Sequence, residues 1–187
     1  MAIYTNLKAR EMSKHGIFES SRIKETNHLY DCLVRDAGNE VIPVDNSVAL
    51  KIGEFTGNGL QEVYATVAAT TDKIAVTGAV AIIKDAFTKA QNQIYNFYTP
   101  AGTLVKTYEI LPEDIFAVAD YQFTEASATN VKKDAYVVVD GNGQWVAQTG
   151  APSEATYGFI GKIHSLSYDN LGAVTMVRIQ CVQNVQL

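Results

Sequence analysis

The feature that most constrains the fold of this chain is a Gly-Asn-Gly corner that is written twice, beginning at Gly57 and at Gly141. Each corner leads into a short apolar stretch, "LQEVYATVAA" in the first case and "QWVAQ" in the second. Asn-Gly is the favoured centre of a type I′ turn, because both central residues of that turn need a positive φ, which Asn and Gly tolerate. We therefore expect both corners to reverse β-strands.

A glycine-rich corner can also cradle a phosphate or hold a metal ion. A phosphate-binding loop ends in Gly-Lys-Ser/Thr and precedes a helix, whereas both corners run into predicted strands. The stretch "DGNGQ" places Asp140, Asn142 and Gln144 at alternate positions, faintly like a calcium loop. However, Ala151 stands where such a loop needs its bidentate Glu. We expect neither a cofactor nor a metal ion in this protein.

The sequence after the two corners is also alike. "VYATVAATTDKIAVTGAVAII" follows the first corner, and "WVAQTGAPSEATYGFIGKIHSL" follows the second. In both, a short strand with Ala precedes a polar stretch, and an apolar strand then reaches a glycine, Gly78 or Gly161, at nearly the same spacing. The sequence therefore predicts two related β-units within one architecture.

Short apolar runs separated by turn residues predict a mainly β fold: a small barrel or sandwich of short antiparallel strands, with an extended N-terminal arm and one or two short helices. We divide the chain into an arm (1–27), a first β-unit with an aromatic hairpin (28–126) and a second β-unit (127–187), separate from the first or continuous with it. The hairpin joins "QIYNFYT" to "TLVKTYEIL" through "PAG", and "KDAFTKAQNQ" (84–93) is the best helix candidate.

Composition narrows the class of protein. The 187 residues are 47% hydrophobic and 19% charged, as in an ordinary folded protein. A net charge of -5 argues against nucleic acid as a direct partner of the whole chain, although the arm itself is weakly basic. The two cysteines, Cys32 and Cys181, have no metal-ligand spacing and suit a reducing compartment. No secretory signal or membrane-spanning stretch is apparent, so we expect synthesis and assembly in the cytoplasm.

We find no catalytic constellation in the sequence and expect that the protein is not an enzyme. The histidines have no ligand spacing, and adjacent carboxylates such as Glu113 and Asp114 point to opposite faces of a strand. A belt of aromatic residues from Tyr95 to Phe123 could stack on a carbohydrate, but Lys106 is its only basic residue. Core or subunit contacts are the more ordinary role for such residues.

The order of the segments resembles a known class of protein. The arm leads into "NHLYDCLV", then "VALKIGEFTGNGLQEVYATVAATTDKIAVTGAVA", then "QIYNFYTPAGTLVKTYEILPEDIFAVADYQF", then "KDAYVVVDGNGQWVAQ" and "YGFIGKI". This layout, over roughly residues 28–182, is similar to that of structural virion proteins of tailed bacteriophages, in particular capsid decoration or cement proteins.

The resemblance implies a protein of the virion, assembled in the host cytoplasm, that binds the major capsid protein from outside and bridges its subunits, often as a homo-oligomeric trimer or dimer. A phage tail or head-fibre component, or a module that binds carbohydrate or another host-surface ligand, is the alternative. We expect capsid or subunit contacts from apolar residues of the arm and the aromatic hairpin. These residues are Ile3, Tyr4, Leu7, Met12, Ile17, Phe18, Tyr95, Phe97 and Tyr98. Deletion of residues 1–20 should then leave a folded body that attaches weakly.

Overall fold

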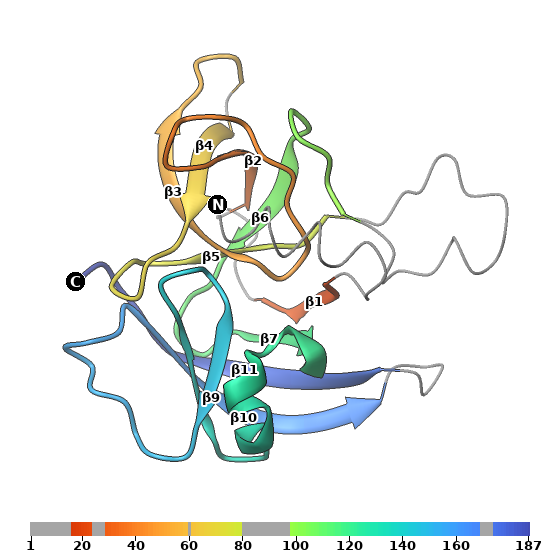
Figure 1. Ribbon diagram of the computed structural model, residues 1–187, viewed down its shortest axis with the longest axis vertical. Helices are drawn as coiled ribbons and strands as arrows, with labels where there is room; N and C mark the ends of the chain where they lie inside the picture. The colour runs from red at the N-terminus through yellow and green to blue at the C-terminus, as the bar shows by residue number, and fades with distance from the viewer. Residues whose placement is uncertain (1–15, 24–28, 60, 80–97, 169–173) are drawn as a thin grey trace, which may run out of the picture.

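The computed structural model describes residues 16–23, 29–59, 61–79, 98–168 and 174–187. Within this part the chain is mainly β, as predicted, and comprises a closed five-stranded barrel and a six-stranded antiparallel sheet (Figure 1). The barrel contains β2 (Leu29–Arg35), β3 (Ala49–Phe55), β4 (Glu62–Val67), β5 (Ala75–Thr77) and β6 (Val105–Glu109). The sheet contains β1 (Phe18–Arg22), β7 (Ile115–Ala119), β8 (Tyr136–Val139), β9 (Trp145–Gln148), β10 (Phe159–Tyr168) and β11 (Thr175–Asn184).

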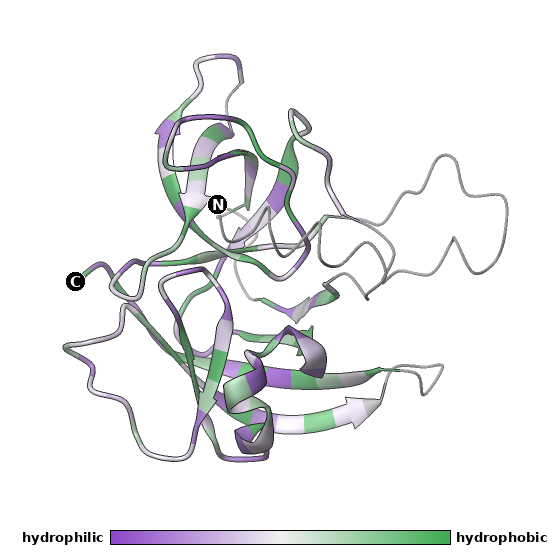
Figure 2. Ribbon diagram, viewed as in Figure 1, coloured by the Kyte–Doolittle hydropathy of each residue, from purple (hydrophilic) through white to green (hydrophobic). Residues whose placement is uncertain are grey.

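The barrel closes through a parallel pair of strands. Its order is β2-β4-β3-β5-β6, and β2 pairs in parallel with β4 from Asp31↔Glu62 to Arg35↔Thr66, while the other pairs are antiparallel. Because successive strand residues face opposite sides, alternate side chains fill the interior. The buried residues of this interior cluster are Cys32, Val34, Ile42, Val44, Leu50, Val63, Ala65 and Val105. Buried residues accordingly alternate with more exposed ones along β4 and β6, whose ribbons change between hydrophobic and more hydrophilic residues in Figure 2.

The second unit repeats the strand order of the first. In the sheet the order β9-β8-β10-β11-β7 matches β4-β3-β5-β6-β2 of the barrel, strand for strand along the chain. The units differ in how they close. Where β2 and β4 pair over several residues, the second unit has an isolated parallel bridge, Phe123↔Trp145, and β7 pairs with β1 instead. The two related β-units predicted from the sequence therefore share one topology.

Both glycine corners reverse antiparallel neighbours, β3 into β4 and β8 into β9. The turn type was predicted wrongly. At the second corner only Gly143 has a positive φ, and the Asp140 carboxylate accepts the backbone N–H groups of Asn142 (2.8 Å) and Gln144 (2.9 Å). A type I′ turn would need a positive φ at Asn142 as well. The first corner likewise has its positive φ at Gly57 and not at Asn58.

The two units share one hydrophobic core. Ile74, Val76 and Ile110 of the first unit are buried in the same cluster as Phe116 and Trp145 of the second. The rings of Phe116 and Trp145 lie 5.6 Å apart between centroids. The change from barrel to sheet falls between β6 and β7, upstream of the boundary predicted at residues 126 and 127. The common core joins the two units into one body.

Residues 16–23 of the expected arm belong to this body. Strand β1 pairs with β7 at the edge of the sheet, and Ile17 is buried among Ala117, Ala119 and Met176. The Gln122 amide oxygen accepts the N–H groups of Ile17 (3.2 Å) and Ala119 (3.0 Å). An arm that spans all of residues 1–27 is therefore too long, because the pairing with β7 holds its C-terminal part. Residues 1–15 and 24–28 lie outside the described residues.

The described part of the chain contains little helix, and β6 pairs with two strands of the barrel. The described helices are short 3₁₀ helices, η2 (Asp120–Gln122) and η3 (Glu125–Asn130), whereas the helix expected at 84–93 lies outside the described residues. The aromatic hairpin was expected to pair "QIYNFYT" with "TLVKTYEIL". Residues 93–97 of the first segment lie outside the described residues. In the described part, β6 pairs with β2 and β5 along its two edges, and Thr99 forms an isolated bridge with Val44.

Candidate binding groove

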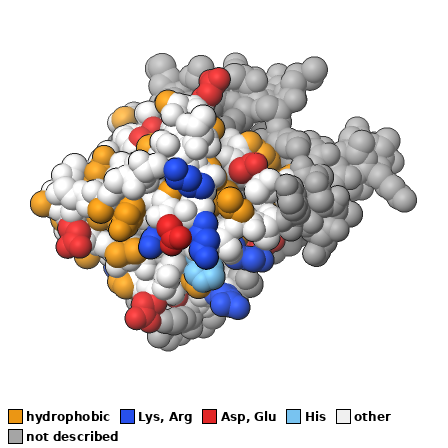
Figure 3. Space-filling view, turned by 90° about the horizontal axis from the view of Figure 1, so that it is seen from below, with side chains coloured by type: hydrophobic (Ala, Val, Ile, Leu, Met, Phe, Trp, Pro, Cys, Tyr) orange, Lys and Arg blue, Asp and Glu red, His pale blue; other side chains and the backbone are white. Residues whose placement is uncertain are grey.

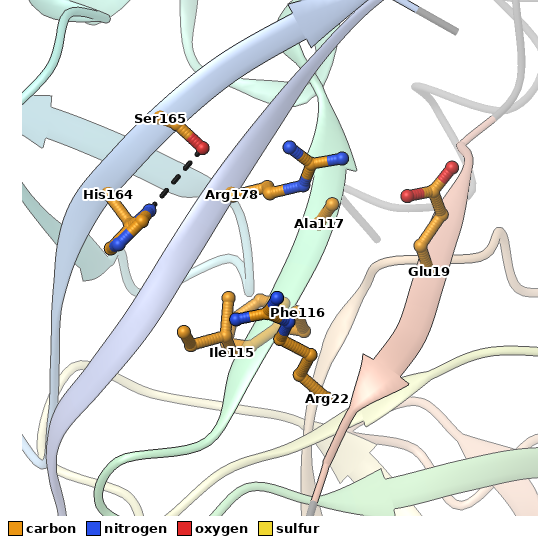
Figure 4. A pocket seen from close by; sticks show the side chains of 8 residues that line it. All are labelled: Glu19, Arg22, Ile115, Phe116, Ala117, His164, Ser165 and Arg178. Atoms are coloured by element: carbon orange, nitrogen blue, oxygen red, sulfur yellow. Dashed lines mark hydrogen bonds between the residues drawn. The ribbon is translucent and has the colours of Figure 1, made fainter. Parts of the chain in front are cut away.

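A groove of about 220 Å³ lies on the outer face of the six-stranded sheet, over β1, β7, β11 and β10. Basic side chains gather around a histidine on this face, which is seen from below in Figure 3. The groove is lined by Glu19, Arg22, Ile115, Phe116, Ala117, His164, Ser165 and Arg178 (Figure 4).

Strand register builds this groove. Glu19 is paired with Ala117, Ala117 with Arg178, and Arg178 with Ser165, so the four residues form one row across the sheet. Paired residues on neighbouring antiparallel strands project to the same face. The small Ala117 side chain therefore stands between two long ones and leaves a depression. In Figure 4 the Arg178 side chain lies between Ser165 and Glu19.

A second row sets the other side of the groove. Arg22 is paired with Ile115, and Ile115 with Gln180 on the next strand. Ile115 and Ala117 form an apolar floor, because residues two apart on β7 share a face. Phe116, between them, points the other way and packs against Trp145 in the core. The alternation along β7 thus fixes both the core and the floor of the groove.

The groove is locally basic on an acidic protein. Arg22, Arg178 and His164 are exposed, whereas the chain has a net charge of -5. Among the described residues, neither guanidinium forms an ion pair or a hydrogen bond. The groove can therefore offer two planar, permanently charged donors to an anion, and guanidinium groups match carboxylate and phosphate geometry.

The paired lysines elsewhere on the chain differ from the two groove arginines. Lys51, Lys106 and Lys162 each lie within 3.2 Å of a carboxylate of this chain. The acidic side chain that lines the groove is that of Glu19, on the opposite side of Ala117 from Arg178. Within the described residues, no carboxylate of this chain pairs with Arg22 or Arg178, so both can bind an external anion. The three lysines are already paired.

The groove does not assemble an activated nucleophile. His164 Nδ1 and Ser165 Oγ lie 3.4 Å apart, at the limit of a hydrogen bond, and the imidazole is exposed. Glu19 is three strands away from Ser165, which is about 14 Å at the usual spacing of strands, so it cannot orient the imidazole. No group of three or more His, Cys, Asp and Glu residues in the described part of the chain could hold a metal ion. The arrangement is suited to binding.

The two cysteines are free and buried in different cores. Burial raises the pKa of the Cys32 thiol to about 11 and that of the Cys181 thiol to about 12. Both thiols are therefore protonated near neutral pH and behave as small apolar groups, because the thiolate is the reactive form. Neither contributes to the groove.

The structure places the expected contact residues unevenly. Ile17 and Phe18 are used inside the chain: Ile17 is buried, and the Phe18 ring lies 5.3 Å from that of Tyr108 and 5.9 Å from that of Phe116. Tyr98 is 43% exposed and remains a candidate contact. The other expected contacts lie outside the described residues; they are Ile3, Tyr4, Leu7, Met12, Tyr95 and Phe97.

The aromatic belt is mainly a packing feature in its described part. Phe116 and Phe123 are buried, and Tyr108 packs against the same core. Tyr121 packs against the cluster around Ile17. A carbohydrate platform needs several exposed rings on one face, and here only Tyr98 has an exposed ring among the described aromatic residues from Tyr98 to Phe123.

Sequence reasoning missed the groove. Alternation in "TMVRIQCVQ" could have placed Arg178 on the face opposite Val177 and Ile179, since a lone charge between apolar residues of a strand points outward. Nothing in the sequence signals that Glu19 and Arg22, far upstream, pair with β7 beside it. The groove depends on strand pairs that are distant in sequence, which a local pattern does not encode.

Comparison with protein-family models found none that matches this chain, and searches among curated proteins and solved structures found no match either. No helix in the described part of the chain is long and apolar enough to cross a membrane.

Proposed function

We propose that this chain is a structural virion protein that binds the outside of a phage capsid and stabilises it by bridging capsid subunits. The observation that carries this proposal is a basic groove on the outer face of the six-stranded sheet, in a β-protein with one shared core and a net charge of -5. A cement protein must hold a fixed shape between neighbours, and two β-units around one core supply that shape. The resemblance in segment order adds to this support.

The size of the groove favours a protein partner over a small substrate. Cavities that bind drug-sized molecules and cofactors usually measure about 300 Å³ or more and enclose their ligand. The groove measures about 220 Å³ and its rim side chains are exposed. It fits one or two side chains of another protein, which is how a partner surface is recognised.

Apolar side chains near the C-terminus support contact with further copies. Val182, Val185 and Leu187 are 42–49% exposed. The Val185 N–H donates to the Gly158 carbonyl oxygen (2.9 Å) and the Leu187 N–H to that of Thr71 (3.0 Å). A backbone pinned in this way presents apolar side chains at little further entropic cost. We propose a homo-oligomer, a dimer or trimer, in which this segment lies at the contact.

Co-sedimentation with capsids tests the proposal. The purified protein should pellet with capsids of the phage that encodes it, more strongly after the shell has expanded, and should raise the temperature at which the shell breaks. Immunogold labelling of virions then separates this role from that of a tail or head-fibre component. Label on tails or fibres alone, or no pelleting with either form of the shell, would reject the decoration role.

A further inference from the structure

We propose that the groove binds an acidic segment of the capsid protein: one carboxylate between Arg22 and Arg178, with a neighbouring apolar side chain on the floor formed by Ile115 and Ala117. This inference rests on the proposed function, because it names the part of the partner that the groove recognises. The charge, the shape and the strand register of the groove support it.

Charge selects the class of ligand. Arg22 stands beside Ile115 and Arg178 beside Ala117, so the two guanidinium groups border the same floor from different strands. Neither has an acidic partner among the described residues, whereas Lys51, Lys106 and Lys162 each have one. A carboxylate from outside can therefore accept hydrogen bonds from an arginine without first displacing an internal ion pair.

Shape selects a side chain over an extended polymer. The floor is apolar, and the groove is small enough that one carboxylate and one apolar side chain fill it. Binding of nucleic acid needs a longer basic stripe that neutralises several phosphates in a row. Here Glu19 interrupts the basic face at the rim, and the net charge of -5 repels a polyanion beyond the groove. A folded acidic partner avoids this repulsion by presenting one short segment.

Glu19 offers a substitution that should strengthen binding of the acidic segment, whereas substitution of an arginine should weaken it. It lies in the same row as Arg178, on the far side of Ala117, so its carboxylate lowers the positive potential that a ligand meets. Glu19→Gln removes this charge and keeps the shape of the side chain. The variant should therefore bind the acidic segment more tightly, while Arg178→Glu should bind it more weakly.

The experiment compares charge reversals inside and outside the groove. Arg22→Glu and Arg178→Glu are set against Lys133→Glu, an equal charge change at an exposed turn residue. Pelleting with capsids should weaken at least about tenfold for each groove variant and less than about twofold for the control. Circular dichroism and thermal melting show whether each variant is folded. If the groove variants are folded and pellet as the wild type does, the groove inference is overturned while the proposed function stands.

A peptide probe separates the two proposals. The probes are a fluorescent peptide with Glu beside Leu, a matched peptide with Gln in place of Glu, and a single-stranded oligonucleotide. Fluorescence anisotropy should show binding of the acidic peptide alone, lost in Arg178→Glu and strengthened in Glu19→Gln. This result without pelleting would keep the groove and reject the decoration role. Binding of the oligonucleotide through the same arginines, or no binding of the acidic peptide, would overturn the inference.

Discussion

Buried amide side chains satisfy backbone groups where strand pairing ends, and one of them joins the two units. The Asn184 amide accepts the Ile74 N–H (2.8 Å) and donates to the carbonyl oxygens of Ile74 (2.8 Å) and Ile110 (2.6 Å). It thus replaces a strand partner for backbone groups of the first unit. Within the first unit, Asn46 does the same for Ala79, whose N–H and carbonyl oxygen both bind its amide. An unsatisfied buried polar group is costly, so Asn184 fixes the junction and Asn46 fixes a loop of the first unit.

Replacement of Asn184 by Leu should lower the free energy of unfolding by about 3 kcal/mol, because it leaves one N–H and two carbonyl groups buried without partners. Urea denaturation measures the change. Gln183→Leu is the matched control, since the neighbouring amide bonds carbonyl groups nearer the surface and should cost less than about 1 kcal/mol. Equal effects of the two substitutions would contradict this role for Asn184.

Asp72 should make stability depend on acid pH. Burial alone would raise the pKa of its carboxyl, but hydrogen bonds from Lys51, the Ala69 N–H and Gln186 lower the pKa below the ordinary value of 3.8. The bound carboxylate therefore adds stability above that ordinary value, and this contribution is lost as the pH falls through the lower pKa of the folded state.

The substitution Asp72→Asn tests this dependence. It should destabilise the protein near pH 6, and its deficit relative to the wild type should shrink as the pH falls toward about 3. Urea unfolding at a series of pH values measures the deficit. Glu154→Gln, at an exposed residue, serves as the control and should give a small difference at every pH. A deficit for Asp72→Asn that stays constant with pH would show that the charge of Asp72 is not the cause.

At the scale of elements, β1 is the strand whose role differs most from expectation. Its buried neighbour Ile17 and its own Phe18 pack on opposite faces of β7, and the Ser47 hydroxyl donates to the Ile17 carbonyl oxygen (2.6 Å). In the first unit the edge of β2 is covered by β4, whereas β7 depends on β1. A deletion that removes β1 therefore exposes part of the core.

Two truncations distinguish attachment from stability. A chain that begins at Gly16 retains β1 and should melt close to the full-length protein, while losing the arm residues Ile3, Tyr4, Leu7 and Met12 expected to contact the capsid. A chain that begins at residue 24 should melt at least about 5 °C lower, because the edge of β7 and the Phe116 ring lose their cover. Scanning calorimetry measures both. Equal melting temperatures would show that β1 adds little stability.

Local patterns predicted the elements better than their pairing. Alternation identified the strands, and the Asn-Gly corners identified two reversals, because both signals come from residues that are close in sequence. The pairing of β1 with β7 and the parallel closure of β2 on β4 join distant segments, and their side chains carry no local mark. The groove depends on the first of these pairings. Ile17 and Phe18 were therefore interpreted as outside contacts although their apolar character serves the core.

At the scale of the molecule, neither unit is complete alone. Ile74, Val76 and Ile110 of the first unit face the core of the second, and the Trp145 indole N–H donates to the Ser47 carbonyl oxygen across the junction (2.7 Å). Separation would expose these apolar side chains and leave the indole N–H without its partner. Stability therefore belongs to the pair of units.

The whole chain should unfold in one step. Trp145 is the only tryptophan, and it lies in the shared core, so its fluorescence reports on the junction. Urea transitions followed by this fluorescence and by far-ultraviolet circular dichroism should coincide. Two separated transitions, or well-dispersed NMR spectra from residues 29–110 expressed alone, would show that the first unit is an independent domain.

The two Gly-Asn-Gly corners differ in their surroundings, and this determines where a foreign peptide can be inserted. A Cβ at Gly143 would lie 2.6 Å from Val67 Cγ1 and 2.7 Å from the Ala49 carbonyl oxygen, so the second corner is wedged against the barrel. A Cβ at Gly57 would meet nothing within 4 Å. A peptide should therefore be inserted at the first corner, where the added residues project into solvent and leave the junction between the two units unchanged.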